Sequence, residues 1–262
     1  MKKGLKKFMA GALSIMAVGV MTACGGGNSD TLTVATSANF PPFGYLAEGG
    51  GYAGVDMQLA ALLAEELGME LEIQNMPFAS VLVATQTGQA DIALSAMTIN
   101  DARRENMNFT IPYLVSGQVI ITHVGNNSLD GMTAEQIITH LYGARMGAGT
   151  PANTGAIFAY NVIQADVVNF QGTALMAAGL SQGLEGIEYG ILDHSVAATM
   201  IAEHGNLKVV DVPLTREYYG IGVVLGDYEL LDKLNEALHT ILSDGRFDAV
   251  LAQYGLQQDM GR

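Results

Sequence analysis

The chain has 262 residues, and its 26 acidic side chains against 12 lysines and arginines give a formal net charge of −14. Nucleic-acid binding depends on neutralising phosphates, so this charge argues against a nucleic-acid partner. It also disfavours contact between the body of the protein and an anionic membrane. The single cysteine excludes an internal disulfide, so the fold depends on packed cores.

The N-terminal segment has the layout of a secretory signal peptide, which we expect over residues 1–23. Four lysines among the first seven residues precede an uncharged, mostly apolar run from Phe8 to Val20. This run is shorter than the about 20 apolar residues of a transmembrane helix. Without the four lysines, eight basic residues stand against 26 acidic ones, a net charge of −18.

Cys24 follows the small residues Thr22 and Ala23 directly. This pattern resembles a bacterial lipobox, in which the cysteine is diacylated and becomes the mature N-terminus, although Met21 stands where a lipobox usually has Leu. The alternative is an ordinary signal peptide with an unmodified cysteine. We expect residues 24–30 to form a lipidated cysteine and a flexible tether, which anchors an extracytoplasmic protein to the cell membrane.

Strand and helix patterns alternate along the rest of the chain. Residues 31–36 alternate as a strand does, 37–51 are rich in Pro and Gly as loops are, and 55–67 have helical spacing before Gly68. Further strands are predicted at 71–76, 91–95, 118–124, 144–147, 167–170, 189–192, 207–212 and 219–225, and further helices at 80–87, 133–141, 153–163, 173–180, 195–202, 228–242 and 246–254. This alternation predicts an α/β fold with mainly parallel sheets.

Eight parts of the chain form a series of motifs: Phe40–Tyr45, Gly54–Asp56, Gly88–Ala93, Ser95–Arg104, Asn108–Tyr113, Gly149–Thr150, Asp193 and Gly245–Gly255. In their order and spacing, these motifs resemble the family 3 extracellular solute-binding proteins of amino-acid ABC importers. The resemblance implies a two-lobed fold of the type II periplasmic-binding-protein kind, with each lobe a mainly parallel sheet flanked by helices. Two crossing strands join lobe one, residues 31–115 plus 216–262, to lobe two, residues 116–215. The ligand then lies in the cleft, and closure is a hinge motion.

The same resemblance implies a monomeric binding protein, not an enzyme, that captures an extracellular amino acid and delivers it to the membrane permease of an ABC importer. It implies no cofactor. The five histidines form no pair with metal-ligand spacing, so we expect no metal site.

Two charged residues match the family's receptors for the two charges of an amino acid. Arg103 matches the arginine that binds the carboxylate, and a guanidinium fork suits that group. Asp193 matches the aspartate that holds the ammonium. The alternatives are a solvated loop arginine and an aspartate that caps the following helix.

The remaining candidate ligand-binding residues are polar groups at strand ends and two aromatic walls. Ser95, Ala96 and Thr98 lie where a strand ends, which is where open α/β sheets bind ligands. Thr150 is expected to open a helix with Pro151 at its first position, which places a helix N-terminus near the carboxylate. Ordinary turn chemistry is the alternative for these residues.

Phe40 and Phe78 match positions that sandwich the ligand side chain in relatives, and core packing is the alternative for both. Asp56 is expected to cap a helix, and Asp101 is expected to orient Arg103.

The ligand side chain is only partly indicated. Ser37 stands where relatives that bind lysine or arginine often carry an acid, so a basic ligand is disfavoured. Gly147 stands where relatives that bind polar ligands often carry Lys or Gln, so a neutral amino acid is favoured. An acidic one stays open if Arg145 or Arg216 points into the cleft.

Two other functions share the fold. Dehydratases of cyclic dienyl acids keep the carboxylate-binding arginine, but they need an acid with a raised pKa in the cleft. No motif places a spare carboxylate there. An amino-acid-sensing or adhesin lipoprotein would use the same cleft.

Overall fold

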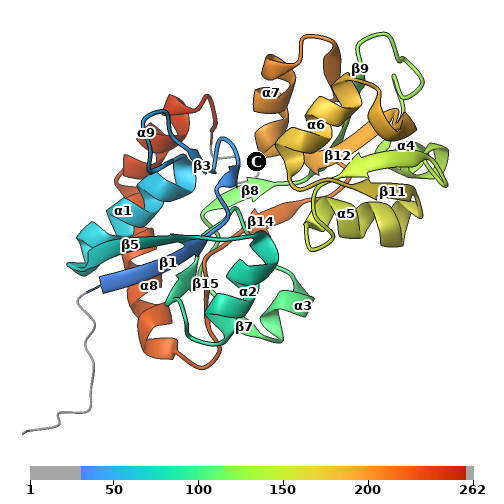
Figure 1. Cartoon of the computed structure of the whole chain (residues 1–262). Helices are drawn as coiled ribbons and strands as arrows, with labels where there is room; N and C mark the ends of the chain where they lie inside the picture. The colour runs from blue at the N-terminus through green and yellow to red at the C-terminus, as the bar shows by residue number, and fades with distance from the viewer. Residues whose placement is uncertain (1–30, 258–262) are drawn as a thin grey trace, which may run out of the picture.

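The computed structural model describes residues 31–257 as two α/β lobes joined by a pair of crossing strands (Figure 1). The predicted fold class is confirmed. The signal peptide expected over residues 1–23, and the lipidated Cys24 and tether expected over residues 24–30, lie outside the described residues.

Lobe one contains a five-stranded sheet of order β5-β1-β6-β15-β7, a small sheet of order β2-β3-β4, and five helices within the described chain. Its strands are β1 Thr31–Thr36, β2 Asn39–Phe40, β3 Gly44–Leu46, β4 Tyr52–Ala53, β5 Glu70–Asn75, β6 Ile92–Ala93, β7 Met107–Phe109 and β15 Gly222–Val224. Its helices are α1 Val55–Leu67, α2 Phe78–Gln86, α3 Asp101–Arg104, α8 Tyr228–Ser243 and α9 Arg246–Gln253.

Lobe two contains a five-stranded sheet of order β11-β10-β12-β9-β13. Its strands are β9 Gln118–His123, β10 Arg145–Ala148, β11 Asp166–Asn169, β12 Tyr189–Asp193 and β13 Leu207–Val210. Its helices are α4 Ala134–His140, α5 Thr154–Phe158, α6 Thr173–Ser181 and α7 His194–Glu203, with a π-helical turn at Ala159–Ile163 and a 3₁₀ turn at Leu184–Gly186.

The two large sheets share one arrangement of strand directions. In each, four strands run the same way, and the strand β15 or β9 runs against them. β9 follows the first crossing strand, β8 Leu114–Ser116, and β15 follows the second, β14 Glu217–Tyr219. The reversed strand of each sheet is therefore the one that enters from the other lobe. The other strands point their carboxyl ends toward the cleft.

The crossing strands β8 and β14 pair antiparallel and approach closely near Gly117. A Cβ atom on Gly117 would lie 2.1 Å from the carbonyl oxygen of Thr215. Glycine is therefore required there by space.

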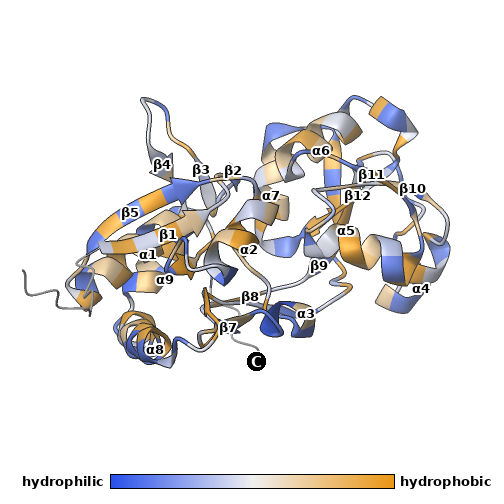
Figure 2. Cartoon of the chain, turned by 60° about the horizontal axis from the view of Figure 1, so that its bottom comes forward, coloured by the Kyte–Doolittle hydropathy of each residue, from blue (hydrophilic) through white to orange (hydrophobic). Residues whose placement is uncertain are grey.

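Apolar side chains fill both lobes. α8 alternates hydrophobic and hydrophilic positions along its ribbon (Figure 2), and Leu234, Leu238 and Ile241 on its inner face are fully buried. No helix in residues 31–257 is both long enough and apolar enough to cross a bilayer.

Several segments differ from the sequence prediction. The strand predicted at 219–225 is the end of β14 followed by the separate strand β15, and β4, β7 and α3 are not among the predicted elements. Residues 37–51, expected as loop, contain β2 and β3, whose strands are only two and three residues long and give no readable alternation. The helix predicted over 153–163 is α5 followed by the π-helical turn, which ends at Gln164 in the left-handed conformation.

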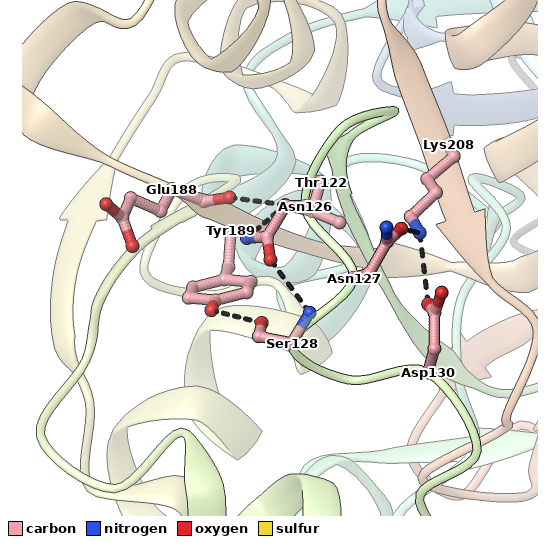
Figure 3. A network of polar contacts seen from close by, with 8 residues as sticks. All are labelled: Thr122, Asn126, Asn127, Ser128, Asp130, Glu188, Tyr189 and Lys208. Atoms are coloured by element: carbon pink, nitrogen blue, oxygen red, sulfur yellow. Dashed lines mark hydrogen bonds and ion pairs between the residues drawn. The ribbon is translucent and has the colours of Figure 1, made fainter.

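A polar network holds the loop after β9 against lobe two (Figure 3). Ser128 Oγ lies 2.8 Å from Tyr189 Oη, and Lys208 Nζ donates to Asn127 at 2.9 Å and to Asp130 at 3.0 Å. Because Tyr189 belongs to β12 and Lys208 to β13, this loop is tied to two strands of the sheet.

Candidate functional site

A cavity of about 40 Å³ lies between the lobes, at the carboxyl ends of their strands. All eight residues predicted to bind ligand line it: Phe40, Phe78, Ser95, Ala96, Thr98, Arg103, Thr150 and Asp193. The other lining residues are Ser37, Asn39, Gly149, Asn153, Thr154, Gly172 and Thr173. Gly172 and Thr173 come shortly after β11, as Gly149 and Thr150 come after β10. Their place after the end of a strand is the sequence signal that would have predicted them as lining residues.

Arg103, on the short helix α3, is buried with 9% of its surface exposed. Its Nη1 donates to the Thr98 carbonyl at 2.6 Å, and its guanidinium lies 5.2 Å from the ring centre of Phe78. It makes no ion pair with any acid in residues 31–257, and burial lowers its pKa, with Glu217 as the largest opposing influence. The site therefore holds an oriented, desolvated cation without a direct anionic partner.

Among the residues that the structure describes, two side chains of lobe one donate hydrogen bonds to backbone oxygens of lobe two. Arg103 Nη2 donates to the Ala152 carbonyl at 3.2 Å, and Asn39 Nδ2 donates to the Gln171 carbonyl at 3.3 Å. In both, a side chain of lobe one meets a backbone oxygen of lobe two. We call this pair of contacts the interlobe latch.

Asp193 ends β12 and is 3% exposed. It precedes α7, but its side chain makes no capping bond. Instead Oδ1 accepts hydrogen bonds from Tyr219 Oη at 2.6 Å and Gln118 Nε2 at 3.1 Å. Burial, reinforced by the negative charge of Glu217, raises the pKa of Asp193 to about 7. The Asp193 side chain therefore does not cap α7, and the alternative role of a helix cap is wrong.

Glu217 is a second buried carboxylate, 6% exposed, which sequence reasoning missed. It lies on the crossing strand β14, where its Oε2 accepts from Thr98 Oγ1 at 2.7 Å and its Oε1 accepts from Thr215 Oγ1 at 2.8 Å. No motif marks it, because Thr98, its partner in the cavity wall, lies 119 positions away in the chain. It adds negative charge near Asp193 and Arg103.

Asp56 holds the turn that carries Ala96. Ala96 has φ of 44°, in the left-handed region that is unfavourable for a residue with a Cβ. Asp56 Oδ2 accepts from Ala96 N at 2.6 Å, and Oδ1 accepts from Tyr113 Oη at 2.9 Å. The expectation that Asp56 caps a helix is wrong, because Gly54 occupies the cap of α1.

Thr150 lies in the cavity wall, but the prediction that it opens a helix is wrong. The helix begins at Thr154, and Asn153 caps it by accepting from Gly155 N at 2.9 Å. Pro151 is exposed in the turn before it. The capping amide of Asn153 explains the shift, since Asn is among the strongest helix caps.

One further expectation on a charged residue fails, and one possibility that the sequence left open is not realised. Asn100, not Asp101, accepts from the backbone of Arg103, at 2.9 Å, while Asp101 is exposed. Arg145 pairs with Asp166 at 2.5 Å, and Arg216 stacks on Tyr218 at 5.7 Å. Neither Arg145 nor Arg216 lines the cavity.

The arrangement can bind a small molecule that carries both charges. One wall offers the guanidinium of Arg103, and another offers the carboxylate of Asp193. Polar groups at the strand ends and the rings of Phe40 and Phe78 complete the walls. Within residues 31–257, no group of three His, Cys, Asp or Glu is placed to hold a metal ion.

Comparisons with known proteins agree with this architecture. A probable histidine-binding protein of Neisseria gonorrhoeae is 28% identical over 271 residues, covering 95% of this chain and 96% of that protein. A cyclohexadienyl dehydratase of Pseudomonas aeruginosa is 39% identical over 94 residues, but this covers only 36% of the chain and 35% of the enzyme.

Solved structures extend the likeness to three dimensions. An ancestral arginine-binding protein bound to glutamine superposes with a TM-score of 0.74 at 31% identity, covering 86% of this chain and 97% of that one. The model of the bacterial extracellular solute-binding proteins, family 3, matches residues 32–257. The chain belongs to this family of extracytoplasmic solute-binding proteins.

Proposed function

We propose that this protein captures a free amino acid between its two lobes and delivers it to the permease of an ABC importer, held at the membrane by a lipid on Cys24. The observation that carries the proposal is that Arg103 of lobe one and Asp193 of lobe two line one cavity. They supply a cation for the α-carboxylate and an anion for the α-ammonium. A ligand held by both bridges the lobes and stabilises the closed form.

A neutral amino acid fits this cavity best. Arg145 and Arg216, the two candidate receptors for an acidic side chain, lie elsewhere, and Ser37 places no acid in the wall.

Binding without chemistry is favoured over dehydration of a cyclic acid. A general acid must carry a proton and aim it at the leaving group. Both oxygens of Glu217 accept hydrogen bonds from threonine hydroxyls, and Asp193 accepts from Tyr219 and Gln118. Glu217 therefore has no free oxygen for this role, and Asp193, whose pKa burial raises to about 7, is the one acid that lines the cavity in the described part of the chain. Binding is favoured because the likeness to a probable histidine-binding protein covers 95% of this chain, whereas the likeness to the dehydratase covers 36%.

The test is a panel of the 20 L-amino acids and a cyclic dienyl acid, each added to the purified protein while its melting temperature is followed. A ligand that binds only the native state raises this temperature. We expect a neutral amino acid to give the largest shift, with Asp193→Asn abolishing it. If no amino acid shifts the melting temperature but the dienyl acid is consumed, the dehydratase function is correct instead.

A further inference from the structure

A second groove, of about 780 Å³, lies beside the crossing strands and is lined by residues of β8, α7 and the segment after α9. The side chains of His194 and Asp211 in its wall are 54% and 86% exposed. The groove is therefore open to solvent.

A chain of three hydrogen-bonded hydroxyl groups connects this groove with the cleft. Ser116 Oγ donates to Ser195 Oγ at 3.1 Å, and Ser195 Oγ lies 3.2 Å from Tyr219 Oη. Tyr219, fully buried, donates to Asp193 Oδ1 at 2.6 Å. Ser116 and Ser195 line the groove, whereas Asp193 lines the cleft. A continuous hydrogen-bonded path thus crosses the hinge region.

The carboxylate at the inner end of this path is poised between its two charge states. Glu217 on β14 and Arg103 on α3 are the charged groups that act on it, while Gln118 on β9 is neutral and His194 on α7 faces Asp211. Burial and Glu217 raise the pKa of Asp193 to about 7, so near neutral pH a fraction of molecules carry a proton there. A ligand ammonium beside Asp193 adds a cation, which lowers that pKa.

We propose that ligand binding drives a proton off Asp193, and that this proton leaves the closed cleft through Tyr219, Ser195 and Ser116 into the groove. The proposal rests on the proposed function, because it needs an ammonium group at Asp193.

The transfer balances at every oxygen. The Asp193 O–H bond breaks and its proton goes to Tyr219 Oη, which passes its own proton to Ser195, which passes its own to Ser116. Ser116 releases its proton to water in the groove. After the transfer each hydroxyl again carries one hydrogen, and that hydrogen points along the path toward Asp193. Ser116 and Tyr219 donate in this same direction in the structure.

Calorimetry tests the equilibrium half of the proposal. L-Glutamine, L-methionine and L-arginine are each titrated at pH 6, 7 and 8 in two buffers of different ionisation enthalpy. We expect any of them that binds to release close to one proton at pH 6, about half at pH 7 and little at pH 8, with Kd rising up to about tenfold per pH unit below 7.

Tyr219→Phe sharpens this test, because Tyr219 donates to the carboxylate and thereby lowers the pKa of Asp193. The midpoint of the Kd profile should move to higher pH in this variant. Binding without proton release at pH 6 and 7 overturns the inference and leaves the proposed function standing. Absence of binding by these three probes and by every other amino acid of the 20-member panel overturns both.

Stopped-flow mixing tests the path. A pH-indicator dye follows the proton, and tyrosine fluorescence follows closure. Ser195→Ala interrupts the path without touching Asp193, so we expect the same number of protons to appear at least tenfold more slowly. Ser195→Thr, which keeps the hydroxyl, should restore the rate. Ser181→Ala is the matched control, at a half-buried serine of lobe two whose hydroxyl donates to Asn206, outside the path. Proton release as fast in Ser195→Ala as in wild type shows that protons leave by another way and overturns the path.

Discussion

Replacing Arg103 with Ala should remove ligand binding without lowering the stability of the ligand-free protein. The guanidinium is buried and has no ion-pair partner within the described chain, so folding bears a desolvation penalty that no salt bridge offsets. Its contacts with the native state are hydrogen bonds to the Thr98 and Ala152 carbonyls and the stacking on Phe78. Losing the desolvation penalty raises the free energy of unfolding, and losing these contacts lowers it. We therefore expect this free energy to change by no more than about 1 kcal/mol, which corresponds to a melting temperature within about 3 °C of wild type.

The effect on binding has no such compensation. Truncating one partner of a buried, hydrogen-bonded charge pair weakens binding by about 2–5 kcal/mol, which corresponds to a Kd about 30-fold to 4,000-fold higher. Calorimetry with the tightest amino acid of the panel measures this change, and thermal unfolding without ligand measures stability. Arg104→Ala is the matched control, because Arg104 is the exposed neighbour on the same short helix. An unchanged Kd for Arg103→Ala would refute the assignment, and a melting temperature many degrees lower would refute the stability argument.

Three other changes probe the fold and the anchor. Burial raises the pKa of Asp56 and of Asp193 to about 7, so between pH 4 and 7 the native state keeps protons that the unfolded state has lost; urea unfolding should show higher stability at pH 5 than at pH 8, each carboxyl group contributing a slope of up to about 1.4 kcal/mol per pH unit, and Asp56→Asn should remove about half of the combined slope. Gly117→Ala places a Cβ 2.1 Å from the Thr215 carbonyl and should lower stability by about 1–3 kcal/mol, whereas Gly125→Ala, with nothing within 4 Å, should not; equal urea midpoints would contradict this. Cys24→Ser should abolish labelling by radioactive palmitate and move the protein from the membrane to the soluble fraction, and an unchanged distribution would exclude the lipid anchor.

Local patterns along the chain predict most of the fold and the walls of the cavity. Strand ends such as Ser95 and Thr150 are visible in sequence, because parallel strands direct their carboxyl ends to one edge. What the sequence does not show is how distant segments meet. Glu217 reaches Thr98 over 119 positions of chain, and Asp193 reaches Gln118 over 75, so no local pattern marks either pair.

Local competition between residues explains the other errors. Thr150-Pro151 is a good helix start, but Asn153 three residues later captures a backbone N–H and moves the start to Thr154. Asp56 has the position of a first-turn helix acid, yet its oxygens face away from the helix to Ala96 and Tyr113. In both cases the residue type was compatible with two partners, and tertiary contacts decided between them.

The interlobe latch has a consequence for how such a protein can diversify. On the lobe-two side both contacts are made by carbonyl oxygens, of Ala152 and Gln171, which every amino acid possesses. Substitutions at these two positions therefore leave the acceptors in place. Lobe two can therefore change the side chains at these two positions and keep both contacts of the latch with lobe one.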